Sequence, residues 1–135
     1  MGLLSLYFDN KTLLFMLDFK ELDVWKEAKH LAILVYGCTE NFPEHELFGL
    51  ANQMRRASVS IPSNIAEGCG RRTDKDKSQF MFTARGSLFE LETQILISKE
   101  LSFLSVIDFE KLSLQIVKCR KLINGYLNYL NYLNK

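Results

Sequence analysis

The chain has 135 residues, of which 47% are hydrophobic and 24% are charged. This composition is typical of one folded domain with a hydrophobic core and excludes an intrinsically disordered chain. The formal net charge of +1 gives no overall reason to expect binding to nucleic acid or to a membrane.

The charges are nevertheless distributed unevenly along the chain. Residues 18–50 carry seven acidic and three basic side chains, whereas residues 51–88 carry seven basic and three acidic ones. The first third of the chain is therefore acidic and its middle is basic, so the middle is where we look for contacts to a polyanion.

The first 17 residues are hydrophobic but are interrupted by polar residues at positions 9–11. We expect neither a membrane span nor a signal peptide, because the apolar runs are short and no basic segment precedes them. We predict an N-terminal extension at residues 1–17 and one bundle domain at residues 18–135. Two interpretations of the extension stay open: an in-frame segment upstream of a natural start at Met16, or a strap that packs on the bundle.

The first helix is predicted over residues 20–39, where apolar residues cover a broad face at helical spacing. The second is predicted over residues 44–67, because Pro43 suits a first helical turn and an apolar stripe follows it. Pro62 lies inside this stripe and predicts a kink, since proline removes one backbone hydrogen bond.

Glycines mark the end of the second helix, and a capping pattern marks the start of the third. Gly68 and Gly70 predict a left-handed C-terminal cap. Thr73 and Asp76 have the spacing of a capping box, which places the third helix at about residues 76–101.

The third helix is apolar on two faces. One stripe consists of Phe80, Ala84, Leu88, Leu91 and Ile95. The other repeats every seven residues on the opposite side and consists of Phe82, Phe89, Leu96 and Phe103. A helix with two apolar faces is either central or shared between subunits. With four helices in total, we predict that the second stripe forms a homo-oligomer interface.

The fourth helix is predicted to start after Ser105, which has capping spacing to Asp108, and to continue to the end of the chain. Its last part contains the short echo YLNYLNYLN, which is too brief to define a repeat array. No segment has the pattern of a strand. Short connections between four long helices predict an all-α protein, an antiparallel up-down-up-down four-helix bundle.

Polar residues also follow helical spacing, beside the apolar stripes of the second and third helices. We predict that they form a buried hydrogen-bond ladder in which Arg56 meets the carboxylate of Glu67 or Glu90. The alternative is a polar active groove. The predicted ladder consists of Gln53, Arg56, Ser60, Asn64, Glu67, Ser87, Glu90 and Gln94.

Metal, cofactor and nucleophile motifs are not found in the sequence. Cys38, Cys69 and Cys119 form no CxxC pair, which argues against zinc and disulfides and fits core positions in a protein of the reducing cytoplasm. A di-metal carboxylate site in a bundle needs Glu-x-x-His on two helices, and His30 and His45 do not supply it. We therefore expect no metal, no cofactor and no enzymatic activity.

Basic residues cluster between the second and third helices. One interpretation is a solvated turn, and the other is a contact to a phosphate backbone. No aromatic residue lies within the turn, so binding there would follow the backbone without reading bases. The candidate nucleic-acid-binding residues are Arg55, Arg71, Arg72, Lys75, Lys77 and Arg85.

Five motifs occur in order: DFKEL-x-VW at residues 18–25, FPxxExFxL at 42–50, QMRRA at 53–57, SIxxNIAEG at 60–68 and GSLxELETQ at 86–94. Together they resemble the four-helix bundle proteins encoded in intervening sequences of bacterial 23S ribosomal RNA genes. The resemblance implies an all-α bundle that forms a ring-like homo-oligomer such as a pentamer. It also implies kinship with accessory proteins of diversity-generating retroelements, which associate with nucleic acid and a reverse transcriptase.

Three hypotheses for function follow. The leading one is a non-enzymatic oligomer that binds structured RNA or a ribonucleoprotein through the basic cluster. The second is a protein-interaction scaffold with no nucleic-acid role, and the third is an enzyme that uses the carboxylates of the second and third helices. The resemblance brings no catalytic residues with it.

Overall fold

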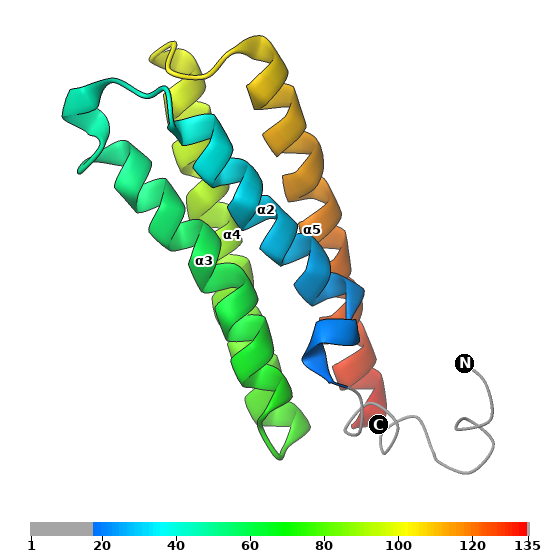
Figure 1. Cartoon of the computed structure of the whole chain (residues 1–135). Coiled ribbons are helices and arrows are strands. Elements are labelled where there is room, and N and C mark those ends of the chain that lie inside the picture. The colour runs from blue at the N-terminus through cyan, green and yellow to red at the C-terminus, as the bar shows by residue number, and fades with distance from the viewer. Residues whose placement is uncertain (1–17, 135) are drawn as a thin grey trace.

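The computed structural model describes residues 18–134, which form an all-α four-helix bundle without strands in that range (Figure 1). The predicted extension at residues 1–17 lies outside the described residues. The predicted boundary between this extension and the bundle domain therefore stays a prediction. The helices are α2 (Asp23–Thr39), α3 (Leu50–Cys69), α4 (Asp74–Glu100) and α5 (Val106–Leu133). Two short 3-10 helices, η2 (Phe19–Glu21) and η3 (Glu44–Glu46), precede α2 and α3.

Each helix packs against two others: α2 and α4 both contact α3 and α5. The α3–α4 turn lies at one end of the bundle, and the α2–α3 and α4–α5 connections lie at the other (Figure 1). The predicted all-α bundle is therefore confirmed. No helix within residues 18–134 has a stretch both long and apolar enough to traverse a lipid bilayer.

The core is built from one apolar stripe of each helix. Buried side chains recur at spacings of three and four residues, as expected for an amphipathic helix that packs its apolar face against a core. The largest side chains that are fully enclosed are Leu31, Met54, Ile61, Ile65, Met81, Leu88, Leu91, Ile95, Leu112, Ile116, Ile123 and Leu130. Two hydroxyl caps fix helix starts as predicted: Thr73 accepts a hydrogen bond from the N–H of Asp76, and Ser105 accepts one from the N–H of Asp108, each at 3.1 Å.

The second helix begins later than predicted. Residues 44–46 form η3, and α3 starts only at Leu50. The Glu46 carboxylate accepts a hydrogen bond from the Leu50 N–H at 3.0 Å, so it caps α3 from outside the helix. Helix α3 then continues through Pro62, which is buried. The kink stays a prediction.

The predicted left-handed glycine cap of the second helix is wrong. Gly70 ends α3 with φ of −83°, in the right-handed region. Gly68 lies inside α3 and is buried, and a Cβ built there would lie 2.8 Å from the Cβ of Phe80 on α4. The glycine is therefore needed for the close approach of two helices and not for a turn.

Candidate functional site

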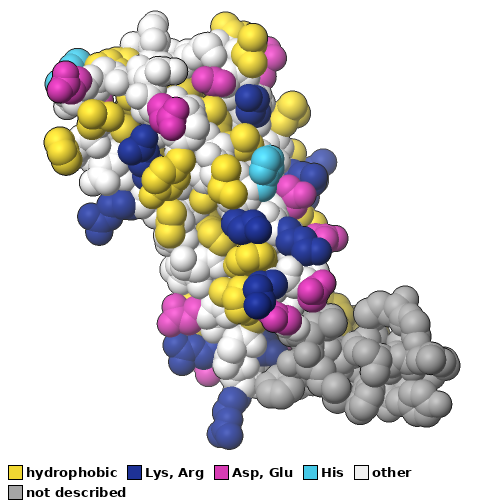
Figure 2. Space-filling view, viewed as in Figure 1, with side chains coloured by type: hydrophobic (Ala, Val, Ile, Leu, Met, Phe, Trp, Pro, Cys, Tyr) yellow, Lys and Arg dark blue, Asp and Glu magenta, His cyan; other side chains and the backbone are white. Residues whose placement is uncertain are grey.

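The α3–α4 turn carries three exposed basic side chains, Arg71, Arg72 and Lys75, which we call the basic turn. The Arg71 guanidinium lies 4.6 Å from the ring centroid of Phe80 and 3.4 Å from the Glu67 carboxylate. That ion pair is solvent-exposed, so it binds Arg71 only weakly. Figure 2 shows Lys and Arg side chains at the lower end of the bundle, with acidic side chains beside them.

Lys77 does not belong to this surface, although the sequence placed it there. Its residue exposure is only 5%, and it interacts with other groups. The reason is helical phase: Lys77 precedes Met81 by four residues and Ala84 by seven, and both of these side chains are buried in the core. Asp74, at 4% exposure, lies on the same inward face.

Arg55 and Arg85 lie apart from the basic turn. Arg55 donates to the Thr39 hydroxyl at 2.9 Å and lies 5.0 Å from the ring centroid of Tyr36. Because 14 residues of helical rise separate Arg55 from Cys69, where α3 ends, roughly 21 Å lies between Arg55 and the end of α3 that leads to the basic turn. Arg85 donates to the Asn124 side chain at 3.0 Å and lies over the ring of Phe82. The six predicted residues thus do not form one patch.

The predicted polar ladder forms only in its inner part. The hydroxyls of Ser60 and Ser87 join α3 to α4 at 2.9 Å, and the Asn64 amide donates to the Ser60 hydroxyl at 3.0 Å. Gln94 is buried, and its amide lies 3.4 Å from the Glu90 carboxylate.

The outer part of the ladder is not buried within one chain, contrary to the prediction. Arg56 forms no ion pair within residues 18–134, and Glu67 bonds Arg71. The close approach of the two helices leaves room for serine but not for longer side chains, which lie outside the seam. The exposed members are Gln53, Arg56, Glu67 and Glu90. All but Glu67 line an open groove of about 430 Å³ with Asn52, Ala57, Ser60 and Ser87.

The second apolar stripe of α4 faces solvent in the single chain. Phe82, Phe89 and Leu96, which we call the outer stripe, are 46%, 48% and 50% exposed. Phe103 is not part of it, because α4 ends at Glu100 and the seven-residue repeat ends with it. Phe103 instead packs inward, with its ring centroid 5.6 Å from that of Phe42.

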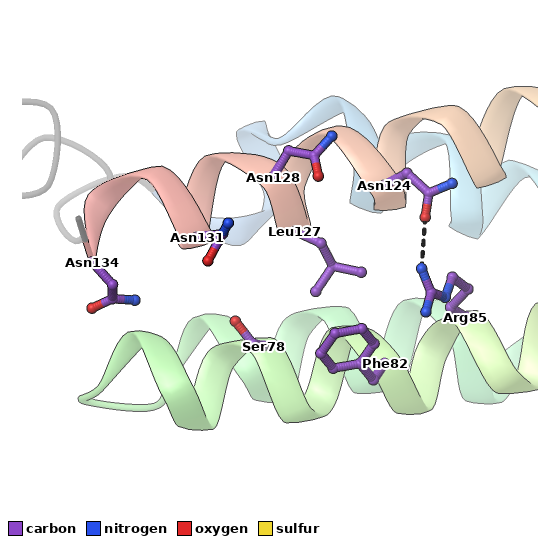
Figure 3. A pocket seen from close by; sticks show the side chains of 8 residues that line it. All are labelled: Ser78, Phe82, Arg85, Asn124, Leu127, Asn128, Asn131 and Asn134. Atoms are coloured by element: carbon purple, nitrogen blue, oxygen red, sulfur yellow. Dashed lines mark hydrogen bonds between the residues drawn. The ribbon is translucent and has the colours of Figure 1, made fainter.

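A second groove lies between α4 and α5, and we call it the amide groove (Figure 3). Its volume is about 570 Å³. It is lined by Ser78, Phe82 and Arg85 of α4 and by Asn124, Leu127, Asn128, Asn131 and Asn134 of α5. The sequence analysis missed this site. The available signal was the YLN echo, which puts asparagine at every third position of a helix.

None of the three cysteines is an activated nucleophile. Burial raises the pKa of Cys38 to about 11 and that of Cys119 to about 12. Burial likewise raises the pKa of Cys69. All three are unpaired thiols that stay protonated at neutral pH. Within residues 18–134, no three His, Cys, Asp or Glu side chains are grouped as metal ligands.

Comparison with known proteins agrees with this architecture. The model of the family described as 23S rRNA-intervening sequence protein matches residues 20–125, which is most of the chain. No curated protein matches the chain. The four helices and the extent of this match together show that the chain belongs to the 23S rRNA-intervening sequence protein family.

Proposed function

We propose that the chain is a non-enzymatic homo-oligomer that binds structured RNA, free or within a ribonucleoprotein, in the bacterial cytoplasm. The observation that carries this proposal is the basic turn: three exposed cations at one end of a bundle whose family is named for an insertion in ribosomal RNA. Three free thiols fit a reducing compartment.

The chemistry of the basic turn suits a phosphate backbone. Arg71 lies over the ring of Phe80, so less side-chain freedom is lost when it contacts a phosphate. Contacts from Arg71, Arg72 and Lys75 release counterions, so the logarithm of the binding constant should fall with the logarithm of salt concentration. The expected slope is about −2 to −3 per subunit.

Assembly would multiply this weak contact. The outer stripe is a row of large apolar side chains at seven-residue intervals, which a second copy can cover. In a closed ring, of which a pentamer is the form we expect, every subunit presents one basic turn, and avidity raises the affinity without new contacts.

The experiment measures salt-dependent binding of a structured RNA by the purified protein. We expect binding at low salt that weakens strongly in R71A/R72A. A matched control is K111A/K121A, which removes two exposed lysines of α5 and should bind like the original protein. Absence of binding at low salt, or equal affinity of R71A/R72A, would refute RNA binding. Native mass of the F89E variant tests assembly, because a charge in the outer stripe should leave a monomer.

A protein-interaction scaffold is the alternative, since the outer stripe also fits an apolar protein partner and the net charge is nearly zero. This alternative predicts a partner protein that is still captured after nuclease treatment, and whose capture is lost in F89E.

A further inference from the structure

The amide groove lies directly beside the basic turn, and we infer that it binds an unpaired base of the RNA whose backbone the basic turn holds. This inference rests on the proposed function and adds a specificity to it: unpaired nucleotides in place of duplex. It also revises the expectation that binding would follow the backbone alone, which was based on the turn's own residues.

The position of the groove is the first argument. Ser78 lies at its α4 side, and Lys75 of the basic turn precedes it by three residues. This separation is about 4.5 Å of helical rise. Figure 3 shows Ser78 and Asn131 opposite each other across the gap between the helices. A nucleotide with its phosphate at Lys75 therefore has the groove within reach of its base.

The free amides are the second argument. Asn124 accepts the bond from Arg85, and the Asn134 amide donates to the Leu130 carbonyl at 3.0 Å. Asn128 and Asn131 are exposed and form no side-chain hydrogen bond within residues 18–134. An asparagine amide presents one acceptor and two donors, which is the pattern that pairs with the edge of adenine.

A stacking surface is the third argument. Phe82 lines the groove with nearly half of its surface exposed, and the Arg85 guanidinium lies 5.0 Å from its ring centroid. The bond to Asn124 fixes the orientation of this guanidinium. Bases that are splayed out of RNA stack on aromatic rings and on arginine planes, whereas bases inside a duplex cannot reach them.

Phe82 belongs both to the amide groove and to the outer stripe, so the inference requires that a second copy covers Phe89 and Leu96 and leaves the groove side of Phe82 open. From Phe82, the outer stripe continues toward Phe89 and Leu96, away from the basic turn. The amides of the groove lie on α5, toward its C-terminal end (Figure 3). Asn128 and Asn131 are therefore the residues that test base binding without altering the outer stripe.

The experiment compares two RNAs with equal numbers of phosphates, a hairpin with an adenine loop and a blunt duplex, by fluorescence anisotropy at one low salt concentration. Stacking and amide contacts should give the hairpin a roughly 5- to 150-fold advantage, as expected for about 1–3 kcal/mol per stacked base. In N128A/N131A, which keeps the stacking surface of Phe82 and Arg85, the advantage should fall roughly 2- to 12-fold, as expected for the loss of about 0.5–1.5 kcal/mol of hydrogen bonding, with unchanged affinity for the duplex. The matched control N41A/N52A alters two exposed asparagines elsewhere and should keep the advantage.

Four outcomes overturn the inference. Equal binding of hairpin and duplex by the original protein removes base recognition and leaves the proposed RNA binding intact. A preference that is undiminished in N128A/N131A moves base recognition to another surface. A reduced native mass of N128A/N131A assigns the groove to a subunit interface. If neither RNA binds, the proposed function fails and the inference fails with it.

Discussion

Helix α4 forms two seams, and they are built differently. At the α3–α4 seam, Gly68 lets the backbones approach, and the small hydroxyls of Ser60 and Ser87 bond across it. At the α4–α5 seam, a long arginine reaches Asn124, and beyond that contact the helices enclose the amide groove. Small residues close a seam, whereas long polar residues bridge one that stays open.

This difference has a consequence for function. Longer polar side chains at a closed seam are displaced to its outside, as Arg56 and Glu90 are. At the open seam, polar side chains and the ring of Phe82 line a larger groove, of about 570 Å³ against about 430 Å³ at the α3–α4 seam. The α4–α5 seam is therefore the better candidate for a binding site, although the polar pattern that is visible in the sequence belongs to α3 and α4.

The largest expected effect concerns the core that both seams enclose, and it tests whether water is kept out of that core. Cys119 precedes Asn124 by five residues and is fully buried, which raises its pKa to about 12. A thiol with a raised pKa stabilises the fold below its unfolded pKa near 9, and this stability is lost as pH rises. The free energy of unfolding should thus stay constant from pH 6 to 8 and then fall on the order of several kcal/mol by pH 11, with Cys119 and Cys38 both contributing to the fall.

Chemical denaturation across this pH range measures the effect at one protein concentration, since assembly would couple stability to concentration. The C119A variant should lose part of the pH dependence. An identical pH profile in C119A would show that Cys119 is reached by water and that the core beside α5 is less tightly packed than its burial indicates.

The second prediction breaks the closed seam. In G68A the new Cβ would meet the Phe80 Cβ at 2.8 Å and the Lys77 carbonyl at 3.3 Å. We expect a loss of about 1–3 kcal/mol, because overpacking forces the helices apart. The control is G125A on α5, where a Cβ meets nothing within 4 Å. It should gain up to about 1 kcal/mol of helix propensity. Equal thermal stability of the two variants would contradict the close approach.

Much of the fold could be predicted from the sequence, because helix starts and faces depend on local chemistry. Thr73 and Ser105 act as the caps that their spacing indicated. The start of α3 could not be predicted, since it depends on the Glu46 side chain folding back onto the Leu50 N–H. Proline and glycine positions alone do not encode that contact.

The site was less predictable, because periodicity tells which face a residue occupies but not how deep it lies. Lys77 was assigned to the surface for its charge, whereas its helical phase turns it inward. Glu90 was assigned to the interior for its phase, whereas the narrow seam leaves it outside. The amide groove depends on the separation of α4 and α5, which no motif in either helix specifies.

The third prediction concerns the hydrogen bond across the closed seam. S87A removes the partner of the Ser60 hydroxyl. Relative to S63A, which alters an exposed serine of α3 with no side-chain hydrogen bond among residues 18–134, it should cost about 0.5–1.5 kcal/mol. Thermal unfolding of both variants measures the difference, and the shared serine-to-alanine change cancels helix propensity. Equal stabilities would mean that water replaces the bond and that the closed seam is wetter than its geometry indicates.

The smallest expected effect concerns the bridge across the open seam. N124A removes the acceptor of the Arg85 guanidinium, which is only partly buried and can turn to water. The cost should therefore be about 0.5–1 kcal/mol relative to N128A, an exposed asparagine one turn further along the same helix. Thermal unfolding gives the difference with helix propensity cancelled. If N124A and N128A are equally stable, the Arg85–Asn124 bond adds nothing to the α4–α5 seam, which its apolar contacts and the Arg120–Glu92 ion pair then hold, and Arg85 stays free to move toward a ligand.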